Sequence, residues 1–155
     1  MSYKESLQGF YKKYCEDTGR KGSVTSEDVA NWAIKKKLWQ PRPRDTANIL
    51  AKELADAWRE EYRTDGKGRR YRAKHAVRGG PMQGTLWADM ETAPRAHMER
   101  AFSQRRHQIV GDCLQLKTDA DVFNDKNPDE EPLTIPLNFT EDVAELQQDQ
   151  GDQAA

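Results

Sequence analysis

The stretch from Tyr62 to Val77 constrains the fold of this chain most, because a tight turn there joins two short segments of alternating character. The turn, Asp65-Gly66-Lys67-Gly68, holds two glycines, which reverse a chain at low steric cost. In the second segment two series alternate: Tyr71, Ala73, His75 and Val77 against Arg70, Arg72 and Lys74. Since successive strand residues point to opposite faces, the pattern predicts a hairpin with one packed face and one exposed basic face.

Charge is distributed unevenly along the chain. From Arg63 to Arg78 there are seven Lys or Arg and a single acid, Asp65. The whole chain sums to -1, but residues 1–80 carry a net charge of +8 and residues 81–155 carry -9. A basic half followed by an acidic half is typical of proteins that bind nucleic acid through the basic half. In such proteins the acidic half solvates the protein or masks its basic surface. Two ordinary solvated surfaces remain the alternative.

Three helical patterns precede the predicted hairpin. The first runs from Tyr3 to Asp17, and Lys21 to Val24 then forms a very short extended piece. Thr25-Ser26-Glu27-Asp28 offers an N-cap for a second helix that ends near Lys37. Two prolines in 40–44 make that segment a connection. The third helix spans Asp45 to Tyr62, with the apolar stripe Ile49, Leu50, Leu54, Ala57, Trp58 and Tyr62.

The acidic half predicts a linker, a long helix and a flexible tail. Residues 81–93 are interpreted as a linker that docks on the core, and 94–124 as a helix beginning at Pro94. A heptad spacing on this helix indicates either a dimerisation seam or a face packed on its own domain: Phe102, Ile109, Cys113, Leu116 and Phe123. Residues 125–155 read as an acidic, largely disordered tail. Within it, Ile135 to Leu146 either lies on its own fold or docks a protein partner.

The order helix, short strand, helix, helix and basic hairpin resembles a winged helix-turn-helix domain over residues 3–78. The segment from Val24 through Leu38-Trp39 is similar to the strand and second helix of the HARE-type members of that superfamily. The fold class expected is therefore mainly α with a small β-hairpin (α+β). A basic winged helix-like domain (1–80) would be followed by the linker, the long helix and the tail.

The resemblance implies that the third helix enters the major groove of double-stranded DNA while the hairpin, Arg63 to Val77, acts as the wing. Asn48 would read an adenine edge, and Arg or Lys would reach guanine or phosphate. Acids on the third helix, among them Glu53 and Asp56, repel DNA, so we place the main contact on the wing. The predicted nucleic-acid contacts are Arg44, Asn48, Lys52, Arg59, Arg63, Lys67, Arg69, Arg70, Arg72 and Lys74.

No motif for catalysis, metal or cofactor binding occurs in the chain. His97 and His107 are ten residues apart on one predicted helix, too far to share an ion, and His75 lies on the packed hairpin face. Cys15 and Cys113 have no CxxC context, which predicts reduced, buried thiols. We expect no enzyme activity, no cofactor, no metal and no membrane partner, and a cytoplasmic location.

Two functions follow from these observations. The first is a dimeric DNA-binding regulator of bacterial or mobile-element type that holds phosphates with its wing. The second is a protein–protein adaptor or accessory subunit, associated with a polymerase or a defence system, whose acidic tail docks a partner.

Overall fold

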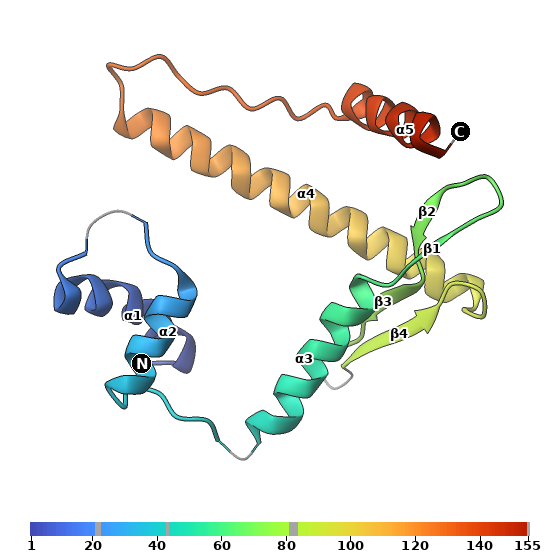
Figure 1. Ribbon diagram of the computed structural model, residues 1–155. Helices are drawn as coiled ribbons and strands as arrows, with labels where there is room; N and C mark the ends of the chain where they lie inside the picture. Colours follow the sequence, from blue (N-terminus) through green and yellow to red (C-terminus); the bar gives the residue numbers. More distant parts are fainter. Residues whose placement is uncertain (21–22, 43, 81–83, 155) are drawn as a thin grey trace. The chain divides into compact units, whose positions relative to one another are not determined.

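A computed structural model describes residues 1–20, 23–42, 44–80 and 84–154. The described chain is mainly helical and carries two small antiparallel sheets, as Figure 1 shows. It divides into two compact units, Met1–Lys52 and Glu53–Ala155. The elements are α1 (Tyr3–Thr18), α2 (Ser26–Lys35), α3 (Asp45–Arg59), β1 (Tyr62–Thr64), β2 (Arg70–Arg72), β3 (Lys74–Arg78), β4 (Thr85–Asp89), α4 (Arg95–Lys126) and α5 (Thr140–Ala154).

Helices α1 and α2 pack through the indole of Trp32. Its ring meets those of Tyr14 and Phe10 edge-on, at centroid distances of 5.7 Å and 6.3 Å. Its Nε1 donates a hydrogen bond of 2.8 Å to Asp17 Oδ2. Helix α1 ends at Gly19, whose φ of 69° is a left-handed conformation that glycine adopts without strain. Trp32 is therefore central to this pairing, and an ion pair between Lys36 and Asp17 at 3.3 Å adds to it.

The first unit departs from the prediction in one place. Ser23 and Val24 form no strand, and the other half of the extended piece predicted there, Lys21-Gly22, lies outside the described residues. Helix α2 begins as predicted, because the hydroxyl of Thr25 accepts a hydrogen bond from the amide of Asp28 at 3.0 Å. Among the described residues, therefore, no strand precedes α2.

Helix α3 is shorter than predicted, because it ends at Arg59 and Tyr62 instead begins β1. Its predicted apolar stripe is also more exposed than expected. No residue of α3 is buried, and Ile49, Leu50 and Leu54 are among the exposed apolar side chains. Amphipathic spacing shows which face of a helix is apolar, but it does not show how completely another element covers that face.

Two consecutive hairpins replace the single hairpin predicted. Strand β1 pairs with β2, with Arg63 opposite Tyr71, while β3 pairs with β4, with Ala76 opposite Trp87. The chain passes from the first hairpin to the second at Ala73, whose amide donates to the carbonyl of Glu61 at 2.9 Å and whose carbonyl accepts from Met90 at 2.9 Å. Part of the predicted linker is therefore strand β4.

The core of the second unit lies where α4 covers β3. Ala73, His75 and Val77 are buried, which confirms the predicted packed face. From α4, Ala101 is buried and the ring of Phe102 meets the imidazole of His75 edge-on at 5.5 Å. His97 Nε2 donates to the carbonyl oxygen of His75 at 2.9 Å. His75 is thus a core residue, as its place in the alternation predicts.

The last part of the tail, Thr140–Ala154, is helical where a largely disordered tail was predicted. After α4 the chain turns back, and the side-chain amide of Asn124 makes two hydrogen bonds of 2.9 Å with the backbone of Leu133. Helix α5 then covers Thr140–Ala154, although acidic and proline-rich composition favoured a flexible segment. Thr140 is the first residue of this helix and Glu141 and Asp142 lie in its first turn, where acids are favoured by the helix dipole.

Candidate nucleic-acid interface

Asp65 builds the tip of the β1–β2 hairpin. Its Oδ1 accepts hydrogen bonds from the amides of Lys67 (2.9 Å) and Arg69 (2.8 Å), and its Oδ2 accepts from Arg69 Nε at 2.7 Å. The amide hydrogen bonds and the Arg69 guanidinium lower the pKa of Asp65. Gly68, with φ of 77°, closes the turn. The acid of the turn therefore has a structural role, and it leaves Lys67 presented at the tip.

Three of the nucleic-acid contacts predicted between Arg63 and Lys74 are already paired with acids. The Arg63 guanidinium donates two hydrogen bonds to the Asp89 carboxylate, at 2.8 Å and 2.6 Å, which lowers the pKa of Asp89 to about 2. Lys74 Nζ contacts the carboxylate of Glu61. Arg69 pairs with Asp65 at 2.7 Å. Forked pairing of this kind holds a guanidinium in place, so these cations stabilise the two hairpins first.

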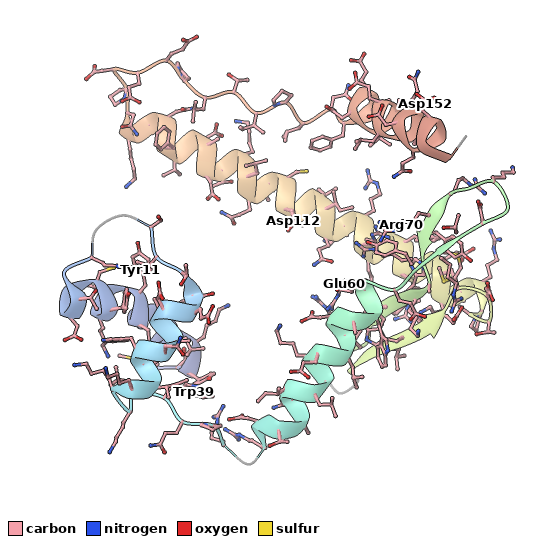
Figure 2. The ribbon with its side chains drawn as sticks, viewed as in Figure 1. Tyr11, Trp39, Glu60, Arg70, Asp112 and Asp152 are labelled. Carbon is pink, nitrogen blue, oxygen red and sulfur yellow. The ribbon has the colours of Figure 1, made fainter. Side chains whose placement is uncertain are left out.

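A second group of hairpin cations has no carboxylate partner among the described residues. It consists of Lys67 at the tip, Arg70 on β2 and Arg72 at the end of β2. The Arg70 guanidinium lies over the ring of Tyr62 at 3.9 Å, a cation–π contact that orients it without neutralising it. Figure 2 labels Arg70 on this hairpin. These three residues form the free cation set of the β1–β2 hairpin.

A groove of about 800 Å³ lies between the β3–β4 hairpin and α4. Basic side chains line it from four elements: Arg59 from α3, Arg72 from β2, Lys74 and Arg78 from β3, and Arg105 and His107 from α4. Gln104 fixes its wall, because its side-chain amide accepts from the amide of Arg78 at 2.7 Å and donates to the carbonyl of the same residue at 3.0 Å. We call this concavity the basic groove.

The residues predicted on the third helix divide between the two units. Arg44, Asn48 and Lys52 belong to Met1–Lys52 and are exposed. Arg59 belongs to the second unit, where it pairs with Asp56 at 3.1 Å and lies over the Trp87 ring at 5.3 Å. Of the predicted contacts, Arg59, Arg72 and Lys74 meet in the lining of the basic groove.

Sequence reasoning missed the part of the basic surface that α4 contributes. Arg105 and His107 were placed only on a helix with a possible seam, and Trp87 was assigned to a linker. The run Arg105-Arg106-His107 was a usable signal, since it is a local excess of basic residues in the acidic half. Nothing in the sequence indicated that this run would face β3, because that contact joins residues about 30 apart in the chain.

The predicted seam residues are not equivalent. Phe102 packs against His75 within the chain, whereas Ile109, Leu116 and Phe123 lie farther along α4 with 51%, 47% and 46% of their surface exposed. Cys113 and Cys15 are free thiols. Both are half-buried, whereas full burial was predicted. Phe102 is itself 50% exposed, so its contact with His75 leaves half of its surface uncovered, as at the other three apolar seam positions.

Comparison of the chain with protein-family models, with curated proteins and with solved structures found no match. Among the described residues, no three His, Cys, Asp or Glu side chains gather in a way that would hold a metal ion. The helices in that part of the chain are also too short or too polar to cross a bilayer.

Proposed function

We propose that this protein binds double-stranded DNA through the β1–β2 hairpin, as the wing of a winged helix-like module. The observation that carries the proposal is the free cation set of Lys67, Arg70 and Arg72, which a turn held by Asp65 presents on one projecting hairpin. Each cation placed on a phosphate releases condensed counterions, so the resulting affinity is largely independent of base sequence. The order of three helices followed by antiparallel hairpins supports the module assignment.

We also propose that two chains pair through α4. Ile109, Leu116 and Phe123 repeat every seven residues and are half exposed, so a second copy of the helix would remove them from water. Pairing would set two wings on one duplex, an arrangement that suits a regulator reading a palindrome.

Sedimentation of the full chain should give about twice 17.8 kDa, and Leu116→Glu should give the monomer mass. A monomeric wild-type protein at micromolar concentration contradicts the pairing.

The test of DNA binding uses anisotropy of a labelled random duplex at low salt. In Lys67→Gln/Arg70→Gln two free cations are lost, and we expect binding to weaken by tenfold or more, since each phosphate contact contributes roughly 1 kcal/mol. The matched control is Asp65→Asn/Arg69→Gln, which removes an internal ion pair without changing net charge. Because asparagine keeps an Oδ1 acceptor for the amides of Lys67 and Arg69, the turn is retained and this variant should bind like the wild type. Equal affinity of the wild type and the first variant would rule out the wing.

A protein–protein adaptor is the second candidate, and one observation favours it. The tail carries a series of apolar side chains that are 42% to 63% exposed: Leu133, Leu137, Phe139, Val143 and Leu146. An apolar series within an acidic segment is a common docking element for a groove on another protein. Absence of duplex binding by the wild type at low salt, together with unchanged folding, would favour this function.

A further inference from the structure

The basic groove has the charge of an anion site. Its described lining residues include no Asp or Glu, although acids are as frequent as bases in the whole chain. Two of its cations are paired elsewhere, since Arg59 contacts Asp56 and Lys74 contacts Glu61. Arg72, Arg78 and Arg105 have no such partner in the described chain. The charge that remains uncompensated is therefore gathered on three guanidiniums that face one concavity.

Arg72 and Arg105 also lie close enough to repel each other. Partial burial of Arg105, and then the positive charge of Arg72, lower the pKa of the Arg105 guanidinium. Folding holds these like charges together, at a cost that a bound anion would remove. Guanidiniums from two elements that converge without an acid between them are suited to forked hydrogen bonds with phosphate oxygens.

An aromatic platform lines the same groove. Trp87 of β4 is half-buried, and the ring of Trp58 braces it edge-on at a centroid distance of 5.4 Å. The Arg59 guanidinium lies over the Trp87 ring at 5.3 Å. Unpaired nucleobases stack on aromatic rings and on guanidinium planes alike, so this pair offers a surface for a base beside the three phosphate-binding cations.

We propose that the basic groove binds a segment of single-stranded nucleic acid, with phosphates on Arg72, Arg78 and Arg105 and a base against Trp87 and Arg59. A volume of about 800 Å³ admits one or two nucleotides and excludes a base-paired helix. Trp87 is the reason to prefer a nucleic acid to an acidic peptide, because a carboxylate chain has no ring to stack there. The site goes beyond the wing contact, since Arg78, Arg105 and Trp87 lie outside the β1–β2 hairpin.

The experiment measures binding of fluorescein-labelled (dT)10 to the full chain by anisotropy, across a salt series. For Arg78→Gln/Arg105→Gln we expect affinity to fall about tenfold and the salt slope to drop by about 1.4, the loss of two single-strand phosphate contacts. Gln104 bonds only the backbone of Arg78, so this variant keeps the groove wall. Trp87→Leu should also weaken binding by about tenfold, while Trp87→Phe retains a ring and should bind nearly as well as wild type.

The control variant is Lys67→Gln/Arg70→Gln, which changes charge by the same amount on the other hairpin. It should lower duplex binding and leave (dT)10 binding within about twofold, whereas the groove variants should show the reverse pattern. Failure of the wing proposal and failure of the groove proposal are therefore distinguishable. If Trp87→Leu does not fold by circular dichroism, the arginine variant decides. Unchanged (dT)10 binding by Arg78→Gln/Arg105→Gln, or equally tight binding of a ten-residue oligoglutamate, overturns the proposal.

Discussion

The salt dependence of duplex binding is the prediction that the structure sharpens most. Counting every cation from Arg63 to Arg78 gives seven, and seven phosphate contacts would give a slope of log affinity against log salt of about -6.3. In the structure Arg63, Arg69 and Lys74 are bound to Asp89, Asp65 and Glu61. Of the four cations left without a carboxylate partner in the described chain, Arg78 lies on β3, and the other three form the free cation set of the β1–β2 hairpin. Three contacts give a slope of about -2.7 for each chain bound.

The two slopes differ enough to be measured readily. Between 50 mM and 200 mM salt, a slope of about -2.7 lowers affinity about 40-fold, whereas about -6.3 lowers it about 6,000-fold. Anisotropy with a labelled 20-base-pair duplex covers both ranges. The Lys67→Gln/Arg70→Gln variant should reduce the magnitude of the slope by about 1.8, and Asp65→Asn/Arg69→Gln should leave it unchanged. A wild-type slope near -6 would refute the reasoning that internal ion pairs withhold cations from phosphate.

The remaining predictions concern stability. Asp89 has a pKa of about 2 in the folded chain against an ordinary 3.8, so its ionised form stabilises the fold fully above pH 3.8. This contribution is lost as the pH falls toward 2. The urea midpoints of Asp89→Asn and wild type should therefore converge near pH 2. Burial lowers the pKa of His75 below 6.5, so the free energy of unfolding should decline as the pH falls through 6.5. The decline should be smaller in His75→Gln. A wild-type urea midpoint that does not change between pH 7.5 and pH 5.5 contradicts this. Ala73 is fully buried, and Ala73→Leu should cost about 1–3 kcal/mol in urea unfolding, with an unchanged midpoint as the contrary result.

The sequence predicted the elements whose signals are local. The caps, periodicity and turn residues of 3–18, 26–35 and 95–126 gave helices within a few residues of their observed ends. The alternation through Ala73, His75 and Val77 identified the buried face correctly. These features depend on neighbours a few positions apart, so a single chain contains the information needed.

What the sequence did not predict depends on distant pairs. Alternation continues through Ala73, so it could not show that β2 pairs with β1 while β3 pairs with β4. Trp87 was assigned to a linker because a five-residue strand between Gly84 and Met90 has few local signals. The pairing of Arg63 with Asp89 joins residues 26 apart, and it turns a predicted phosphate contact into part of the hairpin framework.

The junction at Ala73 sets the tolerance of this region to changes in length. One backbone unit closes both hairpins, by its amide to Glu61 and its carbonyl to Met90. Added residues at the Asp65–Gly68 tip would lengthen the first hairpin alone and leave the pairing of the second intact. One residue added or removed at position 73 would shift the pattern of side chains in both hairpins, since a single step in a strand exchanges its two faces. Relatives of this chain should therefore vary in length at the tip and keep a constant number of residues from Arg70 to Arg78.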